Sequence, residues 1–172
     1  MKASLKESDK AKKSDASSVV AFVKHDHQLC KRSVMYAVKA LCKERQLRFT
    51  PVRQRTLEIL LQSHRGLGAY EVLAKLASNN LAQKPPQVYR ALGFLIEQGF
   101  AHKLEQQNAY VACCEPGTCV NPCFMVCASC GRVAEQPVPS AARQLVAAAS
   151  DLGFSASKSV IELVGVCNEC PG

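Results

Sequence analysis

The chain of 172 residues is 48% hydrophobic and 21% charged, which leaves room for one or two small folded domains. Its apolar runs fall short of the roughly 18 residues that a membrane-spanning helix needs, and the run at 18–23 is shorter than a signal-peptide core of about 7 to 15 residues. We therefore expect a cytoplasmic protein with reduced thiols and no membrane partner.

The formal net charge of +8 is unevenly distributed along the chain. The first 56 residues hold 14 of the 22 Lys and Arg but only 5 of the 14 Asp and Glu, a net charge of +9, whereas the remainder carries −1. A basic block beside a near-neutral remainder favours contact with a polyanion, most often nucleic acid. Residues 1–17 mix Lys, Ser and Asp without apolar periodicity, so we predict a basic, disordered tail over 1–28.

Helical patterns follow the tail. Apolar residues recur at helical spacing over 29–45, which predicts a first amphipathic helix carrying basic residues. Thr50 is a good N-cap and Pro51 suits the first position of a second helix, which should end near Gly66. Two further helices are predicted, over 69–77 and 85–98. Three short helices joined by small turns form the core of a helix-turn-helix domain.

The hydrophobic period changes after Gly99. Residues 100–104 and 109–113 are strand-like runs joined by the polar turn 105–108, which predicts a hairpin. Helices closed by such a hairpin make a winged helix. We therefore predict a winged helix-turn-helix domain over residues 29–113.

Six of the ten cysteines lie within residues 113–135. The last pair of this group, Cys127 and Cys130, has the CxxC spacing, and a second CxxC pair follows near the end of the chain at Cys167 and Cys170. Two such pairs can close one tetrahedral zinc site, because two intervening residues let a tight turn point both thiolates at one ion. The sequence therefore predicts a four-cysteine structural zinc site.

Disulfides and a thioredoxin-like redox pair are the alternatives to this zinc site. Disulfide frameworks belong to secreted chains, and a redox CxxC pair lies at the start of a helix, whereas Gly131 and a strand-like run follow Cys130. Cys30 and Cys42 stand alone in or beside the first helix. We interpret both as small buried hydrophobic residues without a ligand role.

A small module is predicted between the two CxxC pairs. Residues 124–126, 132–136 and 159–167 are strand-like, and residues 140–150 form a helical segment that Gly153 ends. The fold class is therefore α+β, with a winged helix-turn-helix domain followed by a small α/β module over 114–172. The core of this module is small, so the zinc ion would help it to stay folded.

Several of these motifs carry a resemblance. The motifs are Thr50–Arg53, Pro86–Leu92 with Glu97–Phe100, the Cys127/Cys130 pair and Val160–Cys170. Together they resemble the ferric uptake regulator (Fur) family, and Lys84–Pro86 and Phe100–Lys103 resemble its zinc uptake regulator (Zur) branch. The resemblance covers residues 29–170. It implies a homodimeric, metal-activated transcriptional repressor with a DNA-binding domain, a dimerisation domain and a sensing site at the hinge.

The resemblance also implies a regulatory zinc, giving about two zinc ions per chain. Three of its expected ligands map onto His102, Cys113 and Glu135. The fourth should be a histidine ahead of the CxxC pair, and the sequence has none there, so a cysteine must replace it. We favour Cys119 and keep Cys123 as the alternate ligand, because Cys123 directly precedes a strand that leads to the core.

The expected DNA contacts lie on the predicted helices. A recognition helix presents its N-terminal side chains to base edges, here Gln87 and Arg90 with Tyr89 on the adjacent turn. Arg can bond guanine and Gln can bond adenine. The resemblance also places Tyr70 at the DNA, although a packing role is the alternative. The phosphate contacts are expected from Arg53 and Arg55.

These features predict a zinc-responsive repressor of zinc-uptake genes that binds operator DNA as a dimer. The alternative is a regulator of the same family that senses another metal, or peroxide or redox state, through its cysteines. We expect no enzyme, since the His-x-Glu and Pro-Cys-x-x-Cys signature of zinc deaminases is missing, and no small-molecule substrate other than a metal ion.

Overall fold

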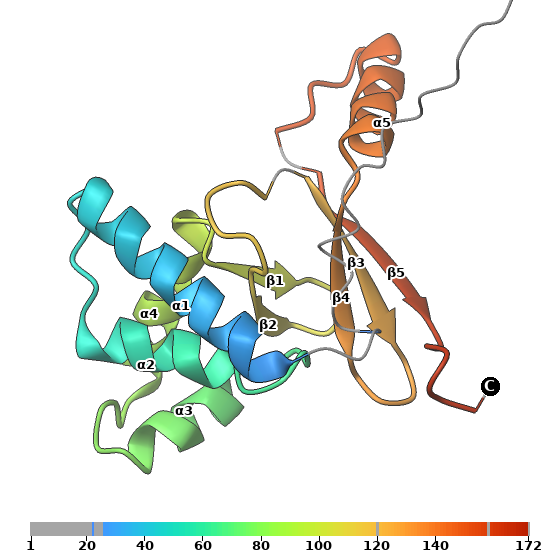
Figure 1. The fold of residues 1–172 in the computed structure, drawn as a ribbon. Coiled ribbons are helices and arrows are strands. Elements are labelled where there is room, and N and C mark those ends of the chain that lie inside the picture. Colours follow the sequence, from blue (N-terminus) through green and yellow to red (C-terminus); the bar gives the residue numbers. More distant parts are fainter. Residues whose placement is uncertain (1–21, 23–25, 120, 158, 172) are drawn as a thin grey trace, which may run out of the picture.

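The computed structural model describes residue 22 and residues 26–119, 121–157 and 159–171. Four helices and a two-stranded hairpin come first, followed by a three-stranded sheet with one helix. Figure 1 shows these two halves side by side, with the hairpin lying between the helices and the sheet. The elements in chain order are α1 (His27–Glu44), α2 (Pro51–Leu60), α3 (Ala69–Ala77), α4 (Pro85–Glu97), β1 (Ala101–Leu104), β2 (Ala109–Ala112), β3 (Pro122–Cys127), β4 (Val133–Pro137), α5 (Pro139–Asp151) and β5 (Ile161–Gly165).

The helices begin where the capping residues require. The Asp26 side chain accepts hydrogen bonds from the backbone N–H groups of Gln28 and Leu29, and α1 therefore starts two residues before the expected position 29. The Thr50 hydroxyl accepts from the N–H of Arg53, with Pro51 at the first helical position, as predicted. Residues 1–21 and 23–25 of the predicted tail lie outside the described residues.

The second helix ends earlier than the sequence predicts. It stops at Leu60 rather than near Gly66, because residues 64–67 pair with strands instead of continuing the helix. Leu67 exchanges two backbone hydrogen bonds with Tyr110 of β2, at 2.9 and 2.8 Å. The same segment also pairs with residues at the start of β4. Arg65 forms a bridge with Arg132, and the His64 carbonyl accepts a hydrogen bond from the N–H of Val133 at 2.7 Å. This segment, 61–68, therefore ties the winged helix to β4.

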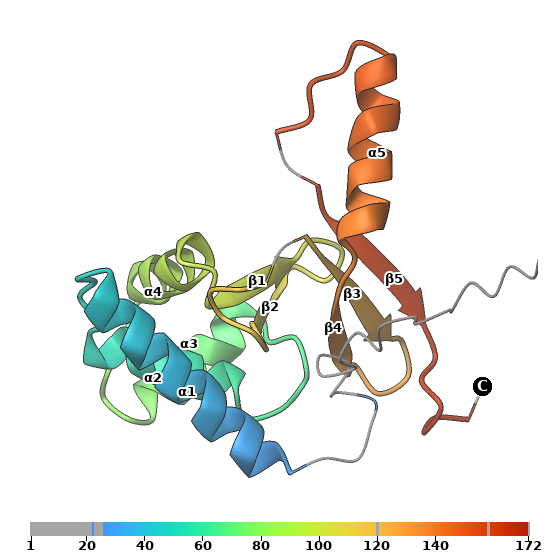
Figure 2. The same cartoon turned by 45° about the horizontal axis from the view of Figure 1, so that its top comes forward.

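The second half is a sheet of order β4-β3-β5, in which β3 is antiparallel to β4 and parallel to β5. β4 returns the chain to the end of the sheet where β3 starts, and α5 links β4 to β5 at that end, so β5 runs parallel to β3. Figure 2 shows α5 standing away from the winged helix, beyond the end of the sheet. Its side chains are mostly exposed, with Ala142 buried and Leu145 and Val146 open to solvent.

The hairpin packs against the sheet and joins the two halves. Leu104, Ala109 and Val111 of the hairpin share one buried cluster with Phe124, Val126 and Val133 of the sheet. The tip of the hairpin is also held, because the Glu162 carboxylate accepts from the N–H groups of Glu105 and Gln106 at 2.7 and 3.2 Å. The predicted α+β architecture, a winged helix followed by an α/β module, is confirmed. Among the described residues, no helix has the length and hydrophobicity to cross a membrane.

Gly66 tests the packing of the segment 61–68 on the hairpin. A Cβ at this position would lie 2.9 Å from the Leu104 Cδ1 and 3.0 Å from the Ala109 Cβ. Both neighbours are buried, so Gly66→Ala should lower the free energy of unfolding by about 1–3 kcal/mol. Gly93→Ala is the matched control in α4, where no atom lies within 4 Å, and should raise it by about 0.5–1 kcal/mol. Chemical denaturation at fixed zinc measures both; equal effects would contradict the packing argument.

Candidate metal centres and nucleic-acid interface

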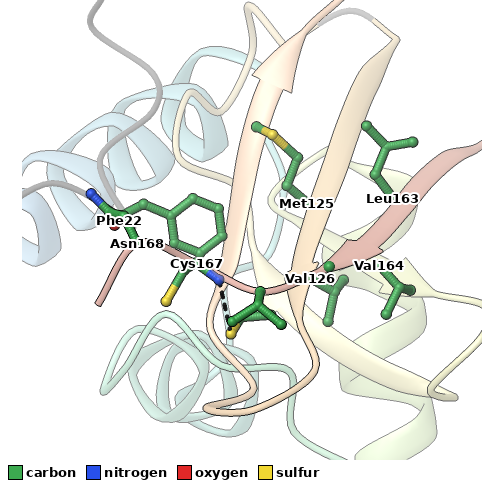
Figure 3. A pocket seen from close by; sticks show the side chains of 10 residues that line it. Phe22, Met125, Val126, Leu163, Val164, Cys167 and Asn168 are labelled. Atoms are coloured by element: carbon green, nitrogen blue, oxygen red, sulfur yellow. Dashed lines mark hydrogen bonds between the residues drawn. The ribbon is translucent and has the colours of Figure 1, made fainter. Parts of the chain in front are cut away.

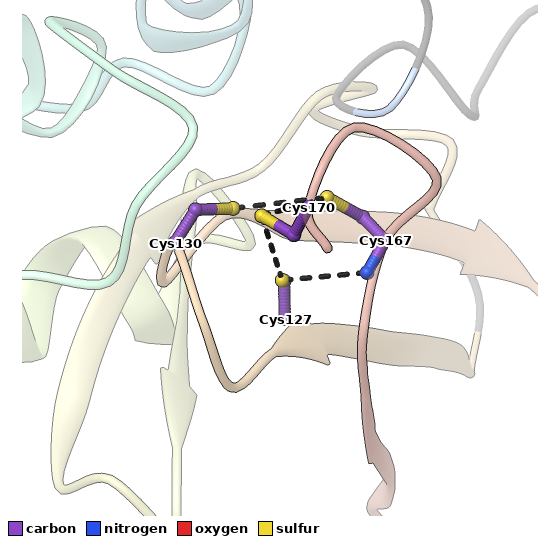
Figure 4. Close-up of side chains that lie close together, drawn as sticks. All are labelled: Cys127, Cys130, Cys167 and Cys170. Atoms are coloured by element: carbon purple, nitrogen blue, oxygen red, sulfur yellow. Dashed lines mark hydrogen bonds between the residues drawn. The ribbon is translucent and has the colours of Figure 1, made fainter. Parts of the chain in front are cut away.

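The four CxxC cysteines converge at one end of the sheet. Cys127 ends β3, Cys130 lies in the turn before β4, and the other two follow β5, so parallel pairing of β3 and β5 brings both loops together. The sulfur atoms of Cys127 and Cys170 are 3.9 Å apart, those of Cys130 and Cys167 are 3.8 Å apart, and those of Cys167 and Cys170 are 3.6 Å apart (Figure 4).

These separations fit a tetrahedral zinc site. Four sulfur atoms about 2.3 Å from one ion lie about 3.8 Å from one another. A disulfide would need a separation of about 2.05 Å, and all four cysteines are free thiols. All four sulfur atoms lie within 4.8 Å of one another, as one shared ion requires. The group therefore has the donors and geometry for a closed structural zinc.

The backbone around this group favours a thiolate. Hydrogen bonds from the N–H groups of Cys130 and Cys167 lower the pKa of Cys127 to about 6, and the Cys167 N–H donates to the Cys127 Sγ at 3.4 Å. The hydrogen bond with Cys167 instead raises the pKa of Cys170 to about 12. An ion pair between Arg132 and Glu169 joins the two loops directly.

A second group lies at the hinge between the hairpin and the sheet. His102 in β1, Cys113 after β2, Cys119 in the following loop and Glu135 in β4 place their ligand atoms within 4.8 Å of one another. We call these four residues the hinge group. The Glu135 Oε1 lies 3.1 Å from the His102 Nε2, 3.5 Å from the Cys113 Sγ and 2.6 Å from the Cys119 Sγ.

The hinge group has the donor set of a tetrahedral zinc site. Around one zinc ion, sulfur would lie about 3.6 Å from a nitrogen or oxygen ligand, and nitrogen about 3.4 Å from oxygen. The observed contacts of 3.8 Å between Cys119 Sγ and His102 Nε2 and 3.5 Å between Cys113 Sγ and Glu135 Oε1 are close to these values. The contact of 2.6 Å between Cys119 and Glu135 is a thiol–carboxylate hydrogen bond that an ion would open.

Hydrogen bonds within the hinge group shift the pKa values of its members. Burial lowers the pKa of His102, but hydrogen bonds to Cys119 and Glu135 outweigh it and raise the pKa to about 9. Burial likewise raises the pKa of Glu135, and the hydrogen bond from His102 reverses this, so the net shift is downward. Cys113 has a raised pKa, chiefly through its hydrogen bond with Cys119, whose own pKa is lowered. Both shifts favour the charged forms of the Glu135 carboxylate and the His102 ring, which lie 3.1 Å apart.

The structure also separates the two candidates for the fourth ligand. Cys119 belongs to the hinge group, whereas the buried thiol of Cys123 points to the carbonyl of Phe124 and lies outside the hinge group. Two supporting contacts escaped the sequence interpretation. The backbone N–H of Cys114 donates to the Glu135 Oε2 at 2.9 Å, and the Phe124 ring lies 5.1 Å from the His102 ring. Neither has a sequence signal, because both depend on how the hairpin docks on the sheet.

The expected nucleic-acid surface is formed by α3 and the start of α4. Arg90 is exposed on α4, and Tyr70 and Tyr89 line a shallow groove between the two helices, with exposed fractions of 70% and 48%. An exposed aromatic residue beside an exposed arginine suits contact with a duplex. The packing alternative for Tyr70 does not agree with this exposure.

The other three side chains expected to contact DNA have partners within the protein. The Gln87 Oε1 accepts from the N–H groups of Gln83 and Lys84 and so caps α4, which competes with bidentate reading of adenine. The Arg53 guanidinium lies 3.6 Å above the Phe94 ring and donates to a backbone carbonyl. Arg55 pairs with Glu58 at 3.0 Å. Arg55 and Glu58 form an i, i+3 pair within α2, whereas Arg53 joins α2 to α4, a contact that the sequence does not reveal.

Comparison with known proteins places these features in context. Residues 44–164 match the model of the ferric uptake regulator family. The chain is 34% identical over 141 residues to the zinc uptake regulation protein of Escherichia coli (strain K12), covering 81% of this chain and 82% of that protein. The zinc uptake regulation protein of Shigella flexneri matches with the same identity and coverage.

Two solved structures share the fold. A zinc uptake regulator complexed with zinc and DNA has a TM-score of 0.74 and 33% identity, covering 81% of this chain and 94% of that chain. Holo XcZur has a TM-score of 0.74 and 38% identity, covering 80% of this chain and 96% of that chain.

The four-cysteine group generates a prediction about stability. Cys170→Ser should remove a chelator-resistant zinc ion and cost several kcal/mol, because a structural ion is bound only by the folded chain. Each kcal/mol corresponds to roughly 2–4 °C in a chain of this size, so the melting temperature should fall by about 10 °C. Cys114→Ser is the control, since it removes a thiol outside the group. Elemental analysis and thermal melts measure both; purified protein without zinc would contradict the assignment.

Proposed function

The chain belongs to the ferric uptake regulator family, and on that premise we propose that it is a zinc-responsive transcriptional repressor. It binds operator DNA as a homodimer when zinc occupies the hinge group, and it represses zinc-uptake genes in the cytoplasm. The observation that carries this proposal is the hinge group itself, in which His102, Cys113, Cys119 and Glu135 meet with their ligand atoms in range of one ion.

The position of the hinge group explains how zinc would act on DNA binding. His102 and Cys113 belong to the hairpin of the DNA-binding half, whereas Glu135 belongs to the sheet of the other half. An ion that joins them fixes the angle between the halves. In a dimer this angle sets the spacing of the two α4 helices, which must match two half-sites on the duplex.

The donor set favours zinc over harder metals. Two thiolates, one imidazole and one carboxylate form a borderline-soft site that suits a tetrahedral ion, whereas magnesium or manganese prefers oxygen ligands. Cysteine at position 119 adds the second thiolate. The similarity to zinc uptake regulators, one of them solved with zinc and DNA, supports this choice of metal. The four-cysteine group would hold a second, structural zinc, for about two ions per chain.

The DNA side of the proposal depends mainly on Arg90. It is exposed on the second turn of α4, where a recognition helix contacts base edges, and its guanidinium can bond a guanine with two hydrogen bonds. Tyr70 and Tyr89 flank this position. Gln87 would contact bases only by leaving its capping position, and Arg53 and Arg55 would reach phosphates only by leaving Phe94 and Glu58.

The homodimer is supported by the exposed face of the sheet. A groove of about 470 Å³ runs over β3 and β5, and its lining residues Met125, Leu163 and Val164 are drawn in Figure 3. Leu163 and Val164 are 56% and 55% exposed, and β5 pairs only with β3 among the described strands. Exposed apolar side chains on a strand with an unpaired edge favour a symmetric contact with a second copy.

Zinc dependence of DNA binding tests the proposal. In a titration at buffered free zinc, the parent should bind a palindromic duplex with two chains per site. The variants His102→Ala, Cys113→Ser, Cys119→Ser and Glu135→Ala should need at least about tenfold more zinc, because each loses a ligand. Cys123→Ser is the matched control and should respond like the parent.

The same titration separates the alternatives. Loss of the response in Cys123→Ser alone would move the fourth ligand to that residue. Binding that is indifferent to zinc but changes with peroxide would replace the zinc sensor by a redox sensor.

Arg90 provides an independent test of the DNA surface. Arg90→Ala should lower affinity for an operator selected from random duplexes by about 5- to 150-fold, the equivalent of 1–3 kcal/mol, and change affinity for unrelated duplex much less. Arg143→Ala removes an exposed arginine from α5 and is the control, with no specific loss. Fluorescence anisotropy at fixed salt and zinc measures both. If the parent and Arg90→Ala bound the operator equally well, α4 would not be the recognition helix.

A further inference from the structure

A third group of potential metal ligands lies at the start of α1, apart from the two groups above. His27 and Cys30 occupy its first turn, one helical turn apart, and His64 lies in the segment 61–68. One ligand atom from each lies within 4.8 Å of the others. Figure 1 shows the start of α1 beside the loop that follows α2. We call these three residues the α1 group.

A small cavity accompanies the α1 group. It measures about 10 Å³ and is lined by all three residues together with Cys113 and Cys114. This volume is about that of one water-sized sphere, so it suits a single ion and excludes a larger ligand. The cavity therefore lies between the α1 group and the hinge group.

From this arrangement we propose that the α1 group is a third metal site, which takes a zinc ion through two imidazoles and one thiolate. Spacing of three residues on a helix brings His27 and Cys30 to one face, and the loop supplies His64 from a distant point in the sequence. Imidazole and thiolate are both zinc ligands, and sites with three protein ligands keep a fourth position for water or another donor.

Packing alone gives a weaker account of the α1 group. The two imidazole rings lie 4.6 Å apart at 59°, an ordinary tilted contact between rings. Such a contact does not need a thiol within ligand distance of both rings, nor a small cavity that all three residues line together with apolar side chains. Cys30 also differs from Cys42 of the same helix, which is buried among apolar side chains in the core.

The site would tie α1 to the bridge between the two halves. His64 belongs to the segment whose carbonyl accepts from the N–H of Val133, and its neighbour Arg65 forms a bridge with Arg132. Val133 lies two residues before Glu135 of the hinge group on β4. An ion in the α1 group would thus hold the start of α1 on the segment 61–68, and this segment pairs with β4, the strand that carries Glu135.

Zinc stoichiometry of the full chain tests the α1 group. At saturating zinc the parent should hold about three ions per chain, and Cys30→Ser and His64→Gln should each hold about two. Cys42→Ala is the matched control, since it removes a thiol from the same helix outside the group, and should hold three. Native mass spectrometry counts the ions. Cobalt substitution should show a thiolate-to-cobalt absorption whose intensity drops in Cys30→Ser.

Hydrogen exchange gives a readout that a packing role would not move. Zinc should slow amide exchange in the first turns of α1 in the parent and Cys42→Ala, and have no effect there in Cys30→Ser and His64→Gln. His27→Gln, at the first residue of the helix, replaces either variant if its circular dichroism shows unfolding. Variants that hold as many ions as the parent would overturn the site. The result is the difference between parent and variants and no DNA is used, so it does not depend on whether the hinge group holds zinc or on the proposed repressor function.

Discussion

The buried carboxylate of Glu135 is the constraint on which the arrangement of the two halves depends. Only 5% of this residue is exposed, and a carboxylate taken out of water must be paired with positive charge and hydrogen-bond donors. The donors come from both sides of the hinge: the backbone of Cys114, the thiol of Cys119 and the ring of His102. A proton on His102 or a metal ion can supply the charge. In the proposed function, a zinc ion at this site would take the place of the proton on His102.

Other contacts also restrict how the hairpin and the sheet can be oriented relative to each other. The hairpin shares a buried cluster with the sheet, and the Glu162 carboxylate holds the tip of the hairpin. The segment 61–68 adds backbone pairing to β4 from the other side. An ion bound among such contacts does not have to create the orientation of the halves. It has only to shift the balance between closely related orientations, which requires differential binding rather than a large binding energy.

Much of this could be predicted from the sequence, since the signals were local. Capping by Thr50, the proline starts of the helices and the two CxxC pairs depend on residues close in the chain, and the elements they predict are present. The end of α2 was predicted wrongly, because residues 64–67 pair with strands that come much later in the chain. Gln87 with Lys84 and Arg55 with Glu58 have the i, i+3 spacing of local partners, so these contacts were visible in the sequence and were missed. The contact of Arg53 with Phe94 was not visible, because it depends on how α2 packs on α4. His27, Cys30 and His64 converge only once α1 packs beside the loop after α2, and no spacing in sequence joins them.

The open side of β5 has a consequence for the protein before it meets a second copy. Edge strands in stable monomers are commonly guarded by lysine, proline or a bulge, and β5 contains none of these between Ile161 and Gly165. Its single charged residue, Glu162, is turned toward the hairpin. In a single chain, this edge of β5 can therefore pair with an extended segment of another polypeptide. Pairing of this edge with a second copy in the proposed homodimer would cover it, and a chain that stays alone would be the form more exposed to aggregation.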